Sequence, residues 1–210
     1  MQYHYIAIEG NIGAGKTTLA HLLAKKLQAR LVLEEFADNP FLEKFYDNPL
    51  QYAFPTELFF MAERYKQLKE MVQAPDLFNT ITISDYMFRK SLLFASINLP
   101  EDEFKLYQKL FDVMYQTMIH PDLLIYLHAP VSKLQKNIRK RNRSFEQHIP
   151  DEYLYNIQTG YTGFMKQQNV KMLLVDVSRA DFLGNPDHLK QITDALDAKF
   201  DSQQNFLTLS

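Results

Sequence analysis

The sequence predicts an α/β protein in which a mostly parallel sheet of about five strands is covered by helices on both faces. Short apolar runs typical of strands alternate along the chain with longer segments whose apolar residues recur every three or four positions. Because parallel neighbours need a helical crossover between them, this alternation favours a parallel sheet. Strands are expected at residues 3–9, 31–34, 80–85, 123–128 and 170–176.

Three helical segments stand out between these strands. The first, residues 16–29, follows the first strand closely. The other two, residues 55–74 and 101–119, are long and amphipathic, so they could form an oligomer interface as well as part of the core. No internal repeat or Gly/Ser-rich linker divides the chain. We therefore expect one domain over residues 1–200 and a C-terminal tail, residues 201–210, that frays.

The composition excludes several classes of protein. With 46% hydrophobic and 23% charged residues, the 210-residue chain lies in the range of folded globular proteins. It contains no cysteine, which rules out disulfide scaffolds, thiol nucleophiles and thiolate zinc sites. A net charge of −2 argues against binding nucleic acid by neutralising many phosphates. No apolar run approaches the ~20 residues of a membrane span, so we expect a cytoplasmic protein that binds neither nucleic acid nor membrane.

A phosphate-binding loop follows the first strand and leads directly into the first helix. Residues 10–17, GNIGAGKT, match the pattern G-x-x-x-x-G-K-[ST] at every fixed position. In such a loop the backbone N–H groups bind phosphate oxygens, Lys16 adds a mobile cation, and Thr17 places its hydroxyl on Mg²⁺. The match in both pattern and setting disfavours a chance glycine turn. We expect a P-loop NTPase-like fold that binds ATP and Mg²⁺ through Gly10, Asn11, Ile12, Gly13, Ala14, Gly15, Lys16, Thr17 and Thr18.

The chain lacks the features of two other classes of P-loop protein. It has no Asn-Lys-x-Asp segment of the kind that reads guanine in GTPases. The strand at residues 80–85 ends in Asp85 without a following glutamate, so the carboxylate pair of many ATPases is missing there. Asp85 lies at the carboxyl end of a strand beside the loop, where it is suited to hold Mg²⁺. The alternative is that Asp85 caps the next helix.

Two carboxylates, Glu34 and Glu35, end the second predicted strand. The carboxyl ends of parallel strands share one edge of the sheet, so both residues are expected near the phosphate loop. A carboxylate at that edge can accept the proton of an attacking hydroxyl group. Taken alone, a glutamate at a strand end is equally compatible with a solvated or capping role.

Five blocks of sequence carry a resemblance to a known family. They are IEGNIGAGKTTLA, EEFADNPFLEKFYDNP, YAFPTELFFMAERYKQLK, ISDYMFRKSLLFA and RKRNRSFE. In content and order, and over essentially the whole chain, the sequence resembles the bacterial deoxynucleoside kinases of the deoxyguanosine and deoxyadenosine kinase branch. The resemblance implies transfer of the γ-phosphate of ATP to a deoxynucleoside 5′-hydroxyl, and an antiparallel helical homodimer.

The resemblance assigns roles to residues that local patterns leave undecided. It implies that Glu34 is the catalytic base and that Glu35 occupies a neighbouring, more variable position. It places Tyr46 and Glu146 at the deoxyribose 3′-hydroxyl and stacks Phe94 on the base. From the residues alone, Tyr46 and Phe94 lie in apolar helical sequence, where packing in the core is the usual role of an aromatic side chain.

A basic run near the end of a predicted helix resembles the arginine-rich lid of the family. Arg141 and Arg143 match the paired arginines that close over the transferring phosphoryl group, whose charge guanidinium groups bind with several donors. The arginine expected one turn earlier is replaced by Asn137, which leaves the lid one charge short unless Arg139 or Lys140 substitutes. The alternative is a solvated helix end, where positive charge is favourable.

Glu57 bears on the choice of substrate, because many family members have glutamine at its position. A carboxylate only accepts hydrogen bonds, and guanine offers adjacent N1–H and N2–H donors. Arg64, two turns later, could donate to guanine O6 and N7. In other members an acid at the position of Lys90 pairs with this arginine, so we expect Arg64 to be free here. Glu57 resembles the deoxyguanosine kinase branch. So does the triplet Ser84-Asp85-Tyr86, which stands where many members have an acid, an arginine and a serine. Alternatively, Glu57 and Arg64 pair with each other or flank a solvated face.

The sequence therefore predicts a purine deoxynucleoside kinase acting on deoxyguanosine and, as a second acceptor, deoxyadenosine. Asp181 and Phe182 complete the expected ATP site, since residues 176–182 resemble the loop that packs against adenine. Two alternatives remain open. A thymidylate-type nucleoside monophosphate kinase would need cations at the acceptor phosphate, which the acidic segment 34–43 does not offer. A nucleotide-dependent regulatory module that hydrolyses ATP slowly is the other.

Overall fold

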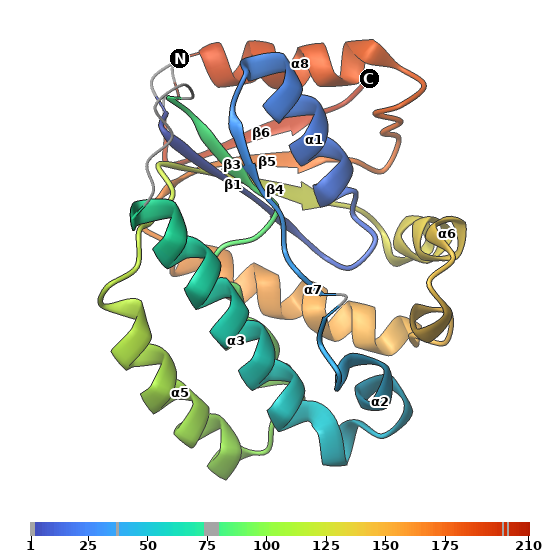
Figure 1. Ribbon diagram of the computed structural model, residues 1–210. Helices are drawn as coiled ribbons and strands as arrows, with labels where there is room; N and C mark the ends of the chain where they lie inside the picture. Colours follow the sequence, from blue (N-terminus) through green and yellow to red (C-terminus); the bar gives the residue numbers. More distant parts are fainter. Residues whose placement is uncertain (1–2, 37, 74–79, 199, 201) are drawn as a thin grey trace.

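The computed structural model describes residues 3–36, 38–73, 80–198, 200 and 202–210. Its centre is a parallel sheet of six strands in the order β2-β3-β1-β4-β5-β6 (Figure 1). The strands are β1 (Tyr5–Gly10), β2 (Arg30–Val32), β3 (Thr82–Ser84), β4 (Leu123–His128), β5 (Lys171–Asp176) and β6 (Gln204–Thr208). The predicted parallel sheet is confirmed, with one strand more than expected.

The additional strand comes from the C-terminal segment that was expected to fray. All of residues 204–208 pair in parallel with β5, from Gln204 opposite Met172 to Thr208 opposite Asp176. The expectation of a frayed tail is thus wrong for β6. The segment is short and lies at the end of the chain, but pairing with the edge of β5 and burial of Leu209 anchor it.

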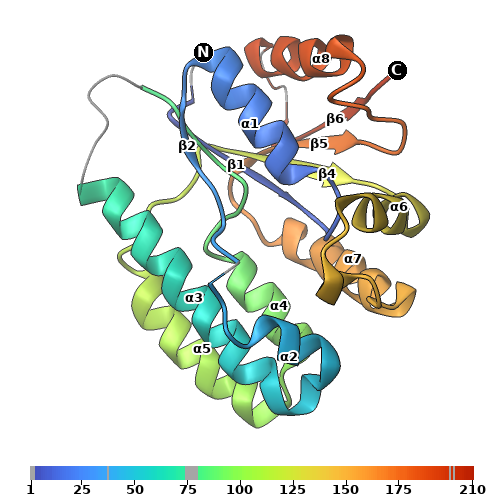
Figure 2. The same cartoon turned by 45° about the vertical axis from the view of Figure 1, so that its right-hand side comes forward.

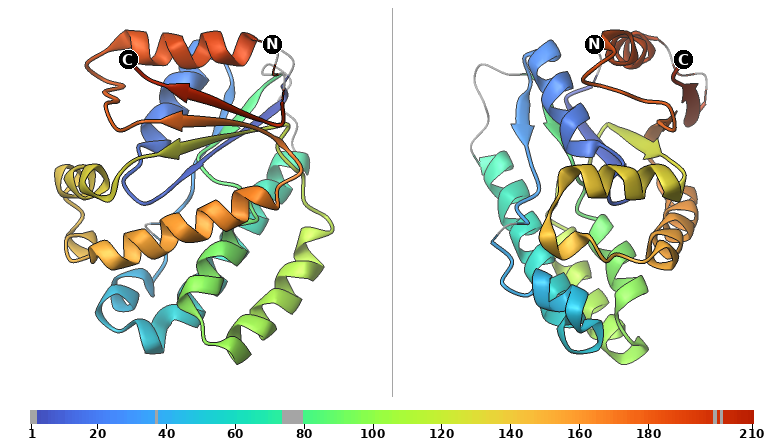
Figure 3. Two further views of the ribbon diagram at one scale, coloured as in Figure 1. Left: turned by 180° about the vertical axis from the view of Figure 1, so that it is seen from behind. Right: turned by 90° about the vertical axis from the view of Figure 1, so that its right-hand side faces the viewer.

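Helices cover both faces of the sheet (Figures 1 and 2). One face carries α1 (Lys16–Leu27) and α8 (Pro186–Asp197); the other carries α3 (Pro49–Gln73), α4 (Lys90–Asn98), α5 (Glu101–Tyr115) and α7 (Asp151–Lys166). At the carboxyl ends of the strands lie α6 (Val131–Arg141), a 3₁₀ turn (Ser144–Glu146) and, farther out, α2 (Leu42–Asp47). The view from behind in Figure 3 shows α7 running along the sheet. Among the described residues, none of the helices combines the length and apolar character needed to cross a bilayer.

The three predicted helices are present with shifted ends. Helix α1 ends two residues before the predicted boundary, and α5 ends four residues early. Helix α3 begins six residues before residue 55, so Pro55 lies inside it, and residue 74 is outside the described part of the chain. Pattern reasoning locates helices better than it locates their ends, because tertiary contacts decide where a helix stops.

Alternation along the strands divides the core into two layers. In β1, Ile6 and Ile8 pack with α1 and α8, whereas Tyr5 and Ala7 pack with the helices of the opposite face. All four side chains are buried, as expected for a parallel strand with helices on both sides. Since all strands are parallel, their carboxyl ends bring the loops after β1, β2 and β3 to one edge of the sheet.

Candidate active site

The loop after β1 has the backbone that a phosphate cradle requires. Gly10, Gly13 and Gly15 all have positive φ, and a Cβ on Gly13 would lie 2.7 Å from the carbonyl oxygen of Leu134 in α6. Side chains are excluded, so main-chain N–H groups line the turn at the start of α1. The ammonium of Lys16 lies across this loop and donates to the carbonyl oxygen of Gly10 at 2.9 Å and to that of Asn11 at 3.0 Å. Burial and the nearby ammonium of Lys90 lower the pKa of Lys16 to about 8.

Asp85 connects the phosphate loop to the end of β2. Its Oδ2 accepts a hydrogen bond of 2.5 Å from the hydroxyl of Thr17, and its Oδ1 accepts one of 2.8 Å from the main-chain N–H of Glu34. The alternative of a helix cap does not apply, because α4 begins after Arg89 without a side-chain cap. Two hard oxygen donors at one point, a hydroxyl and a carboxylate, form a set that suits Mg²⁺.

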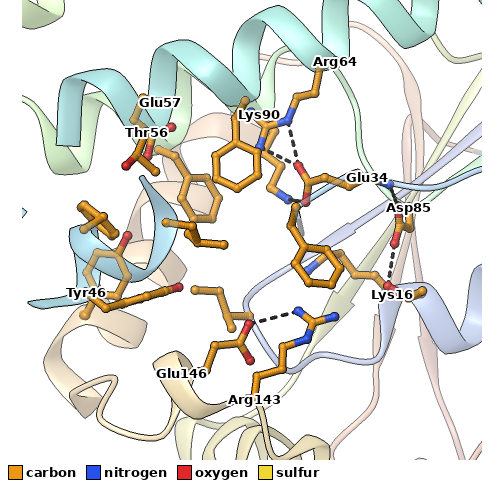
Figure 4. Close-up of a pocket in the computed structure, with 18 of the residues that line it drawn as sticks. Lys16, Glu34, Tyr46, Thr56, Glu57, Arg64, Asp85, Lys90, Arg143 and Glu146 are labelled. Carbon is orange, nitrogen blue, oxygen red and sulfur yellow. Dashed lines mark hydrogen bonds and ion pairs between the residues drawn. The ribbon is translucent and has the colours of Figure 1, made fainter. Parts of the chain in front are cut away.

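Glu34 is held by two cations from two different helices (Figure 4). Its Oε1 accepts from Arg64 of α3 at 2.6 and 2.8 Å, and its Oε2 accepts from Lys90 of α4 at 2.8 Å. Burial by itself would raise the pKa of Glu34, but Lys90 and Arg64 together hold this pKa well below its usual range. Glu35, by contrast, is exposed.

The expectation that Arg64 is free to read a base is wrong. Besides Glu34, its guanidinium donates to the hydroxyl of Ser91 at 2.8 Å, and its side chain is 4% exposed. Lys90 does more than remove the acid that would occupy Arg64, because it brings a second cation to Glu34. In the folded chain, Lys90 and Arg64 converge on the same carboxylate, which the linear sequence does not reveal.

The lid arginines converge on Glu146. Arg141 pairs with Glu146 Oε2, and Arg143 lies 3.1 Å from Oε1 while its guanidinium stacks 3.6 Å above the ring of Phe36. Asn137, which stands where the family has a third lid arginine, makes a neutral contact instead. Its amide donates to the carbonyl oxygen of Gly13 at 2.8 Å and joins α6 to the phosphate loop.

Two cavities meet at these groups. The first, here called the inner cavity, extends from the phosphate loop toward α2, α3 and α7. All seven residues expected to bind the acceptor line it, namely Glu34, Tyr46, Glu57, Arg64, Asp85, Phe94 and Glu146.

The second cavity, the outer cleft, lies between the phosphate loop, α6 and the loop after β5. Asp181 and Phe182, the residues expected to complete the ATP site, line it, and so does Lys140, one of the two candidates to replace the lid arginine missing at Asn137. Four residues line both cavities: Lys16, Thr17, Arg141 and Arg143. Three of these four side chains carry a positive charge.

The far end of the inner cavity carries buried polar atoms without partners. Glu57 is 3% exposed; its Oε1 accepts from the amide of Asn98 at 2.7 Å. Glu57 Oε2 and the hydroxyl of Thr56 have no hydrogen-bond partner among the described residues. Burial, which outweighs Arg64 and Asn98, raises the pKa of Glu57 to about 7. Because buried polar groups are normally paired, these two atoms indicate where a polar ligand would bind.

Comparison with known proteins identifies the family. Residues 6–200 match the family model of the deoxynucleoside kinases. The chain belongs to this family. It is 35% identical to the deoxyguanosine kinase of Bacillus subtilis over 193 residues, covering 90% of this chain and 93% of that protein. It is 33% identical to the deoxyadenosine kinase of Dictyostelium discoideum, covering 91% and 78% of the two chains.

One solved structure is similar to this chain along nearly its whole length. The deoxyadenosine kinase from M. mycoides with bound dCTP superposes with a TM-score of 0.80 at 25% identity, covering 92% of this kinase and 98% of that chain. The P-loop kinase fold predicted from the phosphate loop is confirmed.

Sequence reasoning missed several residues at this deoxynucleoside kinase site. Lys90 was noted only for what it replaces, although a lysine inside the apolar stretch MFRKSLLFA is itself a signal of a buried ion pair. Thr56 precedes Glu57 in an unremarkable helical sequence, and Phe36 follows the glutamate pair without any pattern. Glu9, fully buried behind the loop, accepts hydrogen bonds from Tyr161 and the main chain of Met87.

Proposed function

We propose that this kinase transfers the γ-phosphoryl group of ATP to the 5′-hydroxyl of purine deoxynucleosides and prefers deoxyguanosine. The observation that carries the proposal is the shared wall of the two cavities, where Lys16, Thr17, Arg141 and Arg143 face both. A phosphate donor in the outer cleft and a hydroxyl acceptor in the inner cavity would meet there. The relatives named deoxyguanosine kinase and deoxyadenosine kinase support the choice of a purine deoxynucleoside.

The residues at the junction divide the work of phosphoryl transfer. The acceptor 5′-oxygen forms a bond to the γ-phosphorus, the bond from that phosphorus to the bridging oxygen of ADP breaks, and the hydroxyl proton passes to Glu34. Lys16, Arg141 and Arg143 stabilise the charge on the transferring group. Thr17 and Asp85 would hold Mg²⁺, which neutralises phosphate charge when bound.

The low pKa of Glu34 has a consequence for this step. A carboxylate held ionised by Lys90 and Arg64 is a weak base, so it takes the proton only as the 5′-oxygen becomes acidic by bonding to phosphorus. In a loose transition state the oxygen needs little activation beforehand. Glu34 then serves first as a hydrogen-bond acceptor that orients the hydroxyl.

The inner cavity suits a deoxynucleoside. Tyr46 and Glu146, which lie on the same side of the cavity in Figure 4, would bind the 3′-hydroxyl, and Phe94 would stack on the base. Glu57 Oε2, buried and without a partner, would accept from guanine N1–H. Arg64 takes no part in reading the base, because Glu34 and Ser91 occupy its guanidinium.

A panel of acceptors tests this function. The purified chain would be incubated with γ-labelled ATP, Mg²⁺ and, in separate reactions, deoxyguanosine, deoxyadenosine, deoxycytidine, thymidine or thymidylate. We expect label in the two purine deoxynucleosides, with deoxyguanosine leading, and none with Lys16→Ala. Label in thymidylate alone would indicate the monophosphate kinase instead. ATP hydrolysis without any labelled acceptor would indicate the regulatory module.

We also infer a homodimer, as the family resemblance implies. Helix α5 lies on the outside of the helical layer (Figure 1) and exposes Leu106, Leu110 and Val113, which share one face at helical spacing. An exposed apolar stripe of this kind suits contact with a second copy. Light scattering should give the mass of a dimer, and Leu106→Glu should give a monomer with unchanged helicity.

A further inference from the structure

Lys90 is a buried ammonium group, and its burial needs an explanation. It is the first residue of α4, and its side chain is 6% exposed. The Nζ atom lies 2.8 Å from Glu34 Oε2 and 5.3 Å from the centre of the Phe94 ring. Removing an ammonium from water is costly unless a charged partner and hydrogen bonds compensate. A lysine on the surface would not carry this desolvation cost. The burial of Lys90 therefore points to a role for its ion pair with Glu34.

The same carboxylate is fixed from its other side. Arg64 places two nitrogens on Glu34 Oε1, and Ser91, adjacent to Lys90, fixes the remaining arm of the guanidinium. Each oxygen of Glu34 thus has its own cation, from α3 and from α4. A carboxylate fixed at both oxygens cannot rotate without breaking a charge-assisted hydrogen bond.

We propose that Lys90 is a positioning residue for phosphoryl transfer, which together with Arg64 keeps the Glu34 carboxylate aimed at the acceptor hydroxyl. The proposal rests on the proposed function of the same site. Lys90 acts through Glu34 rather than on the reacting atoms. Oε1 already accepts two hydrogen bonds from Arg64, whereas Oε2 accepts one from Lys90 and keeps its second lone pair for the substrate.

The geometry around Glu34 predicts the effect of removing Lys90. The Nζ of Lys90 donates to Glu34 Oε2 at 2.8 Å, whereas Arg64 donates to Oε1. Without Lys90 the carboxylate loses its contact at Oε2 and can turn about the side that Arg64 holds. A displaced proton acceptor slows transfer without weakening nucleoside binding, because the loss falls on the alignment of the reacting atoms.

The test compares Lys90→Met, which removes the charge at similar length, with Lys90→Arg, which keeps it. For Lys90→Met we expect kcat at pH 7 to fall by about tenfold to a hundredfold, as for a displaced catalytic group. KM for deoxyguanosine should change little. Lys90→Arg should restore most of kcat. Lys66→Met, an exposed lysine of α3, is the matched control and should behave as wild type.

A double-mutant cycle separates positioning from a purely structural role. In a Glu34→Gln background there is no carboxylate to aim, so adding Lys90→Met should lower kcat little further. An equal loss in both backgrounds, or a loss from Lys90→Met that falls on KM instead of kcat, would overturn the proposal. If Lys90→Met does not fold, Lys90→Gln replaces it, because its amide can still donate one hydrogen bond to Oε2.

A measurement without substrate keeps this test independent of the proposed function. Urea unfolding of ligand-free wild type, Lys90→Met, Glu34→Gln and the double variant gives the coupling between the two side chains. We expect the effects of the two single changes on unfolding to be non-additive, as for directly paired side chains. Additive effects would refute the proposal even if transfer to deoxyguanosine is observed. Coupling without any transfer would refute the proposed function and leave the ion pair established.

Discussion

Replacing Glu57 with glutamine should stabilise the ligand-free kinase, and increasingly so as pH rises. Burial raises the pKa of Glu57 from 4.5 to about 7, so between these values the folded chain binds more protons than the unfolded chain. Stability contributed by this group therefore falls as pH rises through that window. At ~1.4 kcal/mol for each pKa unit, an ionised Glu57 costs about 3 kcal/mol above pH 7. Glutamine keeps the shape and the contact to Asn98 without that cost.

The same substitution should change the choice of base. Adenine presents an N1 acceptor where guanine presents an N1–H donor, so ionised Glu57 faces an unmatched buried acceptor when deoxyadenosine binds. Such a mismatch costs about 1–3 kcal/mol, or roughly tenfold to a hundredfold in kcat/KM. Glutamine offers a donor as well as an acceptor and should move the ratio toward deoxyadenosine. In wild type, the preference for deoxyguanosine should increase from pH 6 to pH 8 as Glu57 ionises.

Two assays decide the matter. Denaturant unfolding at pH 5 and pH 8 compares wild type, Glu57→Gln and the control Glu63→Gln, in which a partly exposed glutamate of the same helix is changed. Competition between the two purine deoxynucleosides gives the ratio of kcat/KM for each variant. A stability difference that is the same at both pH values would refute the argument from burial. A wild-type preference for deoxyadenosine, or a ratio unaffected by Glu57→Gln, would refute the argument for base reading.

Three further substitutions test the rest of the site. Lys16→Ala should abolish transfer, with a loss of several kcal/mol of transition-state stabilisation, while circular dichroism and Tm stay near wild type; near-normal turnover would contradict the phosphate-loop assignment. Glu34→Gln should sharply reduce kcat and leave deoxyguanosine binding by calorimetry largely intact, whereas the exposed Glu35→Gln should be harmless; the reverse result would mean that the base was assigned to the wrong glutamate. Gly13→Ala should lower the free energy of unfolding by ~1–3 kcal/mol, because Gly13 has a φ of +80° and a Cβ there would meet a carbonyl oxygen at 2.7 Å. The control Gly163→Ala, in a helix with open space around it, should be neutral or slightly stabilising, and equal effects of the two changes would refute this account.

The parts of the molecule that could be predicted from sequence are those encoded by neighbouring residues. The phosphate loop is a contiguous strand, glycine turn and helix, so its conformation follows from local chemistry. Placing Glu34 and Asp85 beside that loop needed only one further rule, that parallel strands share a carboxyl edge. The family resemblance supplied Tyr46 and Glu146, which the helical pattern alone did not distinguish from core residues.

Tertiary structure alone decided the partners of these groups and the sixth strand. Lys90 and Arg64 lie 56 and 30 residues from Glu34 along the chain, and no periodicity relates them. Their convergence depends on how α3 and α4 pack against the end of β2. The residues of β6 became a strand because the edge of β5 offered hydrogen bonds that an isolated extended segment cannot provide for itself. Sequence thus determined the chemistry available at the sheet edge, whereas packing determined which charges meet there, because pairing between distant side chains exists only in the folded chain.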